Sequence, residues 1–174
     1  GFLTAYQARH PEIKPVYLNI HGFSLARLYE AAQKAAFVSD AFLGPYFSSE
    51  VPAVLKASQY RKIPVLALYA TDTSLAGLSS SFFSLAFSNQ SQAKKIAQVI
   101  EKQGIKKISL VYSGDEPYAA NLVFWLKVFL FQRPGLHLQI INIQNQKGGA
   151  GVFDFLQPLA DTSQGVVYVF SDPR

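Results

Sequence analysis

Hydroxyl and aromatic side chains gather at three places in the sequence, each directly after a short apolar run. These places are residues 45–49, 70–74 and 113–118. Their polar and aromatic members, with the tyrosine that borders them, are Ser48, Ser49, Thr71, Asp72, Thr73, Tyr46, Tyr69 and Tyr118. Hydroxyls bind a polar molecule through hydrogen bonds, and tyrosine rings offer apolar walls with a polar tip. This set of residue types predicts recognition of a small polar ligand.

A carboxylate is the ligand group that two of these residues would suit best. The apolar runs before residues 45–49 and 70–74 are typical of β-strands. If the two strands are neighbours, their ends lie about 4.8 Å apart, close enough for Ser49 and Thr71 to bind one carboxylate. The alternative is structural, with Ser49 capping a helix and Thr71 forming a turn with Asp72. The residue types alone fit both roles.

Catalytic and metal chemistry find little support in the sequence. The three histidines, at positions 10, 21 and 137, lie in different segments without a partner at metal-ligand spacing, and cysteine is absent. The HGFS segment at 21–24 lacks the second glycine of a nucleophile elbow, and the glycine run at 147–151 lacks the lysine and serine of a phosphate-binding loop. We therefore expect no catalytic residue, no metal and no cofactor.

The composition favours a packed protein without a nucleic-acid partner. Of the 174 residues 49% are hydrophobic, and the net charge of +5 is spread along the chain rather than concentrated. The longest apolar stretch, at 121–131, is too short to span a bilayer and contains Lys127, so it predicts a buried helix. The chain contains no methionine and no secretory signal at Gly1, which indicates an N-terminus produced by cleavage or by design.

The elements that must position the polar loops alternate between strands and helices. The predicted strands are residues 15–20, 41–44, 64–69, 82–86, 107–112, 136–143 and 166–170. The predicted helices are residues 25–37, 50–60, 92–103, 118–131 and 152–159. This alternation is typical of an α/β protein with a parallel sheet covered by helices, in which ligands bind at the carboxyl ends of the strands. The three polar loops all lie at such ends.

Serines and glycines punctuate this pattern. Ser24, Ser49 and Ser91 each stand where a side chain could cap the first turn of a helix, and Gly104 could end one. The serine-rich stretch at 74–81 interrupts the regular alternation. We place a boundary between two lobes there, at about Asn89.

Four segments in order resemble the type 1 periplasmic binding protein family, which includes the branched-chain amino-acid receptors. They are FLGPYFSSEVP at 42–52, IPVLALYATDTSL at 63–75, FSLAFSNQSQAKK at 83–95 and ISLVYSGDEPY at 108–118. In that family a Gly-Pro-x-x-Ser turn caps a helix, an Ile-Pro strand ends in an Ala-Thr turn, and a Tyr follows the first strand of the second lobe. The order and spacing of these motifs agree through most of the chain.

The resemblance implies a fold of two Rossmann-like lobes, each a parallel sheet flanked by helices, in an apparently incomplete form. Lobe one would be residues 1–88 and lobe two residues 89–174. Ser48 or Ser49 and the turn of Tyr69, Ala70 and Thr71 would bind the ligand's carboxylate, beside the ring of Tyr46. Tyr118 would close over the ligand from lobe two. The family supplies its ammonium-binding acid farther along than Arg174, so an amino acid is one carboxylate ligand among several.

The chain also departs from the family at both ends. The family's first strand lies in the centre of the lobe-one sheet, between strands that match residues 15–20 and 41–44, and it is absent here. Its loss would leave buried backbone groups unpaired, which is costly. Either residues are missing on both sides, or the sheet order differs, or a partner chain completes the sheet.

These features together predict an extracytoplasmic solute-binding protein that captures a small polar ligand, an amino acid or another carboxylate, for the membrane permease of an ABC transporter. The alternative is the ligand-sensing input domain of a membrane receptor such as a histidine kinase or cyclase, joined to the receptor's own transmembrane segment. An enzyme or cytosolic regulator on a flavodoxin-like fold is the third reading. We expect the periplasm or the outer face of a bacterial membrane.

Overall fold

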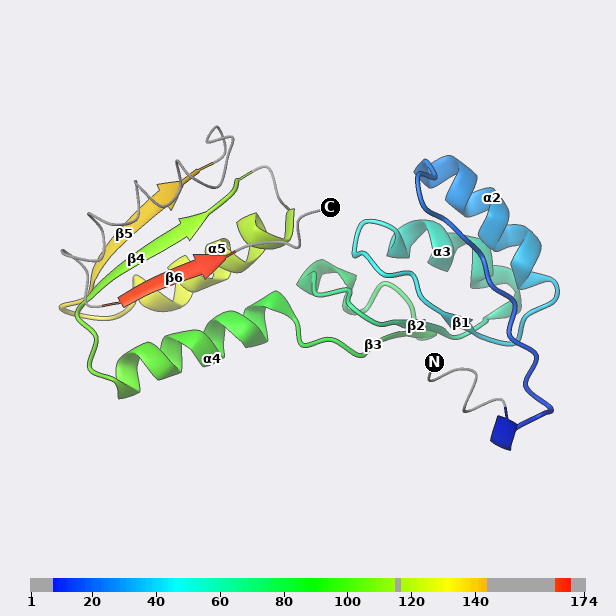
Figure 1. Cartoon of the computed structure of the whole chain (residues 1–174), viewed down its shortest axis with the longest axis horizontal. Helices are drawn as coiled ribbons and strands as arrows, with labels where there is room; N and C mark the ends of the chain where they lie inside the picture. The colour runs from blue at the N-terminus through cyan, green and yellow to red at the C-terminus, as the bar shows by residue number, and fades with distance from the viewer. Residues whose placement is uncertain (1–7, 115–116, 144–164, 170–174) are drawn as a thin grey trace.

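Two three-stranded parallel sheets, each with its own helices, make up the part of the protein that the structure describes (Figure 1). The computed structural model describes residues 8–114, 117–143 and 165–169. The first sheet has the order β1-β2-β3, with β1 at Phe42–Leu43, β2 at Val65–Ala67 and β3 at Phe82–Ser84. The second has the order β5-β4-β6, with β4 at Lys107–Tyr112, β5 at His137–Asn142 and β6 at Gly165–Val169. The predicted α/β class with parallel sheets is confirmed.

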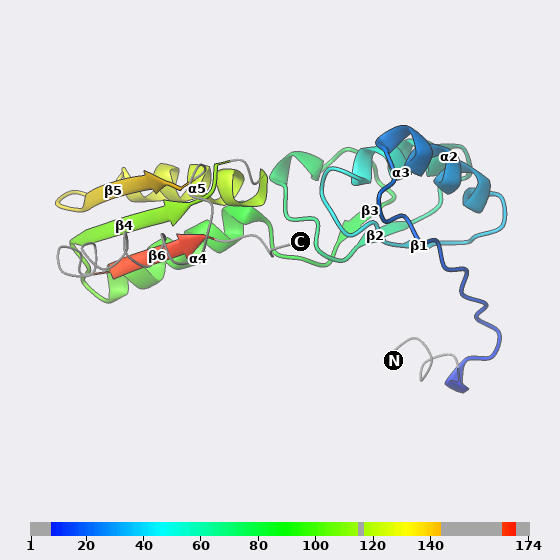
Figure 2. The same ribbon diagram turned by 45° about the horizontal axis from the view of Figure 1, so that its top comes forward.

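Helices α2 at Leu25–Ala36 and α3 at Val51–Ser58 pack on the first sheet. A short 3-10 turn, η1 at Gln59–Arg61, continues α3, and a second, η2, occupies Thr73–Leu75. Helices α4 at Asn89–Lys102 and α5 at Pro117–Leu130 pack against β4 of the second sheet. Figure 2 shows the two groups of elements side by side, joined by the chain between β3 and α4. We call these groups lobe one and lobe two.

Each lobe buries its own apolar core. Val51 and Val65, both fully buried, bring α3 onto β2 in lobe one. Leu110 and Leu126, also fully buried, join β4 to α5 in lobe two. Burying a side chain of this size contributes about 1.5–3 kcal/mol. The two cores share no residue, so each sheet is supported by its own helices.

The helix starts follow the sequence only in part. Ser24 caps α2 as predicted, since its Oγ accepts from the Arg27 backbone N–H at 3.3 Å. The prediction for Ser49 is wrong, because α3 begins one residue later, after Glu50, without a side-chain cap. The prediction for Ser91 is also wrong. Ser88 takes that role and accepts from the Ser91 backbone N–H at 3.2 Å, so α4 begins at Asn89.

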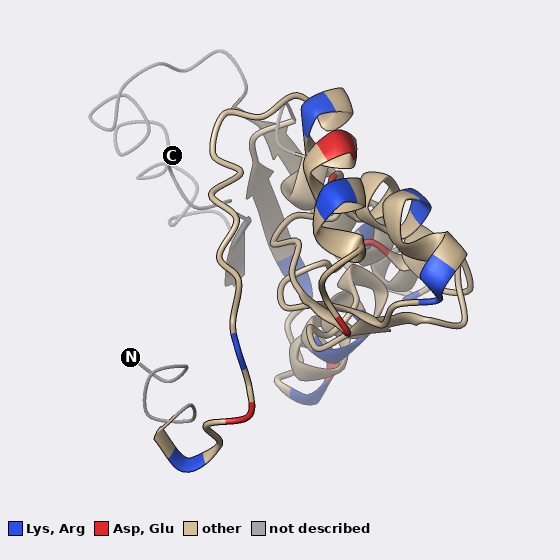
Figure 3. Ribbon diagram, turned by 90° about the vertical axis from the view of Figure 1, so that its right-hand side faces the viewer, with Lys and Arg blue, Asp and Glu red and all other residues tan. Residues whose placement is uncertain are grey.

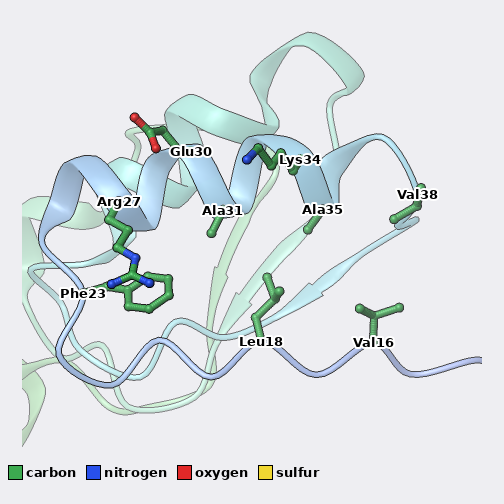
Figure 4. A pocket seen from close by; sticks show the side chains of 9 residues that line it. All are labelled: Val16, Leu18, Phe23, Arg27, Glu30, Ala31, Lys34, Ala35 and Val38. Atoms are coloured by element: carbon green, nitrogen blue, oxygen red, sulfur yellow. The ribbon is translucent and has the colours of Figure 1, made fainter.

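Residues 15–20 do not form the predicted strand. The segment is extended but pairs with no described strand, and it passes beneath α2 (Figure 4). Between Val16 and Leu18 below and the helix above lies a cavity of about 450 Å³. A strand forms only when its backbone groups find a neighbouring ladder, and β1 does not reach this segment. The predicted helix at 152–159 and the glycine run at 147–151 lie outside the described residues.

Candidate ligand-binding site

Ser48 ties together the loops that follow β1 and β2. Its Oγ accepts from the backbone N–H groups of Thr71 at 3.0 Å and Asp72 at 3.2 Å. The two strands are parallel neighbours, with Leu43 in register with Leu66. A hydroxyl oxygen has two acceptor positions, so these two bonds use both and leave Ser48 only its own proton to donate. Ser48 therefore builds the loop junction.

Ser49 and Thr71 keep their hydroxyls free. Ser49 is exposed and Thr71 is half-buried, and neither side-chain oxygen bonds to another residue within the described part of the chain. Ser49 does not cap α3, so the structural alternative weighed for it does not hold. The Thr71 backbone is fixed by Ser48 on one side and by its carbonyl bond to the Asn89 N–H, 2.8 Å long, on the other. These two hydroxyls can meet a ligand without breaking an existing bond.

Tyrosine rings form an apolar wall beside this junction. The rings of Tyr46 and Tyr69 lie with centroids 4.5 Å apart and an interplanar angle of 30°. Phe47 extends the wall, edge-on to Tyr46 at 4.9 Å. Tyr46 is 48% and Tyr69 58% exposed, so both rings keep apolar surface open to solvent. Exposed aromatic surface of this kind can receive the apolar body of a small molecule.

Ala70 and Asp72 both take part in the internal hydrogen bonding of the site loop. Ala70 is buried, and its carbonyl oxygen accepts from the Ser84 Oγ at 2.7 Å. Asp72 caps the η2 turn, because its Oδ1 accepts from the Ser74 N–H at 2.8 Å. The turn-forming role considered for Asp72 is thus what the structure shows.

Tyr118 lies in lobe two and faces α4. Its phenol donates to the Gln92 Oε1 at 2.9 Å, and its ring packs on the lobe-two core. Burial raises the pKa of Tyr118 above the usual value of 10.0, so the phenol stays neutral and remains a donor. Among the described residues, neither a hydrogen bond nor a ring pair joins Tyr118 to Tyr46, Tyr69 or Thr71.

No role was assigned from the sequence to three polar residues near this region. Asn89 and Gln92 on α4 contact α5, and Asn142 at the end of β5 accepts from the Gly114 N–H at 2.9 Å. Asn89 had a visible signal, since it falls four residues before Ala93 on the buried face of α4. Asn142 had none, because its partner is 28 residues away in the chain.

Cavities and charge add two further observations. The cavity beneath α2 and a second one of about 690 Å³, near the C-terminal ends of α4 and α5, both lie away from the Ser48 junction. Basic and acidic residues are dispersed over the helices (Figure 3), and the described residues contain no cluster of His, Cys, Asp or Glu that could hold a metal ion. None of the described helices is long and apolar enough to cross a membrane.

Comparison with known proteins identifies the fold. Residues 22–172 match the family model for the receptor family ligand binding region. No match was found among curated proteins. A solute-binding protein of an ABC transporter from Rhodopseudomonas palustris BisB5, solved with 3,4-dihydroxybenzoic acid, is 16% identical over 96% of this chain and 47% of its own, with a TM-score of 0.74. An ABC transporter substrate-binding protein from Desulfitobacterium hafniense, solved with Leu, is 18% identical over 95% of this chain and 52% of its own, with a TM-score of 0.70.

A third similar structure is the leucine-binding protein LivK from Thermotoga maritima, which is 13% identical over 93% of this chain and has a TM-score of 0.69. The chain spans about half the length of these proteins, 49% in the case of LivK. The TM-scores of 0.69 to 0.74 show a shared fold, and the family model covers most of the chain. The resemblance seen in the four sequence segments is confirmed. The chain thus belongs to the receptor ligand-binding region family and has the fold of the type 1 periplasmic binding proteins.

Proposed function

We propose that this protein is a solute-binding component of an ABC transporter that binds a small carboxylate between its two lobes. The observation that carries the proposal is the Ser48 junction. It fixes the loops after β1 and β2 and leaves the hydroxyls of Ser49 and Thr71 unused beside an exposed tyrosine wall. The proteins it resembles in fold include ABC transporter proteins solved with Leu or with 3,4-dihydroxybenzoic acid.

The ligand class follows from the two kinds of surface at the site. Leucine and hydroxybenzoates share a carboxylate attached to a compact apolar body. Hydroxyls of Ser49 and Thr71 can bind the carboxylate without a formal counter-charge. The rings of Tyr46 and Tyr69 suit the apolar body, and Tyr118 would approach from lobe two when the lobes close. The partner would be a membrane permease, and the place of action the periplasm or the outer face of the membrane.

We also propose lobe limits of 1–88 and 89–174, with one further strand completing the lobe-one sheet beside β1. The segment through Val16 and Leu18 runs in the same direction as β1 (Figure 4), as two strands of a βαβ crossover do. In a parallel strand, the backbone groups of successive residues point alternately to the strand on one side and to the strand on the other. Phe42 and Gly44 donate their N–H groups to the β2 side, so the N–H and C=O of Leu43 point away from β2. A strand placed between Leu43 and Leu18 would pair with β1 and fill the cavity under α2.

A ligand panel tests the binding role on the full-length protein. Leucine, isoleucine, 4-hydroxybenzoate and 3,4-dihydroxybenzoate are titrated by calorimetry and by thermal unfolding, each beside its methyl ester. At a ligand concentration about 100 times Kd, mass action adds about 2.7 kcal/mol to the free energy of unfolding. We expect at least one free acid to bind and its ester, which lacks the carboxylate charge, to bind much more weakly. Equal binding of acid and ester, or binding of no carboxylate, would contradict the proposal.

A further inference from the structure

The connection between the lobes is held by hydrogen bonds from both sides. Asn89, the first residue of α4, is 1% exposed. Its backbone N–H donates to the carbonyl oxygen of Thr71 at 2.8 Å, in the lobe-one site loop. Its side-chain Nδ2 donates to the Oδ1 of Asn121 at 2.9 Å, on α5 of lobe two. One buried residue therefore contacts the site loop of one lobe and a helix of the other.

Gln92 makes a second link one turn farther along α4. Its Oε1 accepts the phenol proton of Tyr118 at 2.9 Å, and its Nε2 donates to the carbonyl oxygen of Phe87 at 2.7 Å. Tyr118 and Asn121 are three residues apart and share a face of α5. Both side-chain bonds from α4 thus reach the same first turns of α5.

The start of the connection is fastened in the same way. Ser84, the last residue of β3, donates from its Oγ to the carbonyl oxygen of Ala70 at 2.7 Å. The connection from Ser84 to Gln92 is therefore hydrogen-bonded to the Ala70–Thr71 turn of lobe one and to the first turns of α5 in lobe two. These hydrogen bonds make the position of the Tyr118 side chain in lobe two depend on the position of the Thr71 loop in lobe one.

We propose that Asn89 and Gln92 are positioning residues, which set where the Tyr118 ring stands relative to the Thr71 loop. They act through Tyr118 and Asn121 and do not touch the ligand. This inference rests on the proposed function for the role of Tyr118 as the residue that closes over a ligand. The hydrogen-bonded arrangement itself can be tested without any ligand.

The Asn89 side chain suits a test because one of its two polar atoms makes a hydrogen bond and the other does not. The Oδ1 atom of Asn89 is buried and has no hydrogen-bond donor in the part of the chain that the structure describes. The cost of this unpaired oxygen offsets the bond made by Nδ2. Replacing Asn89 with alanine removes both at once. We expect the variant to fold with a thermal midpoint close to that of the unmodified protein, while losing its side-chain link to Asn121.

The orientation of the lobes can be measured with spin labels, because these 174 residues contain no cysteine and any cysteine elsewhere in the full-length protein can be replaced by serine. Labels at Tyr60→Cys and Phe131→Cys stand on lobe one and at the end of α5, at positions that are 87% and 68% exposed. Pulsed electron paramagnetic resonance on the full-length protein then gives the distribution of distances between them. We expect Asn89→Ala to widen this distribution about twofold. The matched control, Gln90→Ala, changes the exposed neighbour on the same helix and should leave the width unchanged.

Asn121→Ala provides the second variant, because it removes the same bond from the other side. It should widen the distribution as Asn89→Ala does, and the double variant should widen it no further. Gln92→Leu, which removes the acceptor of the Tyr118 phenol, should weaken leucine or hydroxybenzoate binding about tenfold. Widths equal to that of the control for both asparagine variants would overturn the proposal. Widened distributions in a protein that binds no carboxylate would instead refute the binding function and leave the positioning role standing.

Discussion

Replacing Ser48 with alanine should destabilise the protein although it removes a single oxygen atom. That oxygen accepts from the N–H groups of Thr71 and Asp72, both in half-buried positions. A neutral hydrogen bond contributes about 0.5–1.5 kcal/mol in net terms, and water can reach part of this loop. We therefore expect Ser48→Ala to lower the free energy of unfolding by about 1–2 kcal/mol. In a lobe of this size each kcal/mol lowers Tm by about 4–8 °C.

Ser49→Ala is the matched control. Its hydroxyl is exposed, makes no bond to another described residue and caps no helix, so the free energy of unfolding should change by less than about 0.5 kcal/mol. Its effect should appear in ligand affinity instead, because we place this hydroxyl on the carboxylate. Urea unfolding monitored by circular dichroism gives the stability, and calorimetry with the carboxylate found in the panel gives the affinity. Equal destabilisation by the two variants, or a larger loss for Ser49→Ala, would refute the division of roles between these serines.

Three further outcomes follow from the same geometry. Thr71→Ala keeps the hydrogen bond from the residue 71 N–H to Ser48, so it should cost more free energy of carboxylate binding than free energy of unfolding. Calorimetry and thermal unfolding of the same sample give the two losses, and equal losses would assign Thr71 to a turn-forming role. Burial raises the folded-state pKa of Tyr118 above 10.0, so the folded state holds this proton more tightly than the unfolded state does. Its contribution to stability should be complete below about pH 10 and should be lost as pH rises through the folded-state pKa. Tyr118→Phe should remove that part of the pH dependence in urea unfolding, and an unchanged slope would contradict it. In the full-length protein with Leu18→Cys and Leu43→Cys, oxidation should not form a disulfide, because an intervening strand would hold the two residues about 10 Å apart. Ready formation of that disulfide would show that no strand lies between them.

Local sequence predicted the α/β alternation, six of the seven expected strands, the four expected helices that fall within the described residues, and the cap at Ser24. Each rests on periodicity or on a side chain that bonds within three residues of itself. The rule that ligands bind at strand ends also led to the loops that Ser48 joins. Residues 15–20 failed as a strand because a strand needs a partner, and local sequence does not supply one.

Which serine is free to bind was decided only by the tertiary structure. Ser48 and Ser49 are chemically identical neighbours, and Ser48 is used because the loop 23 residues later presents two N–H groups to it. The same holds for Asn89, whose side-chain partner is 32 residues away on another helix. The sequence by itself determined that hydroxyls and tyrosines would meet at the strand ends. The fold decided which of these side chains already have hydrogen bonds within the protein, because a bond between distant segments depends on packing that no local pattern contains.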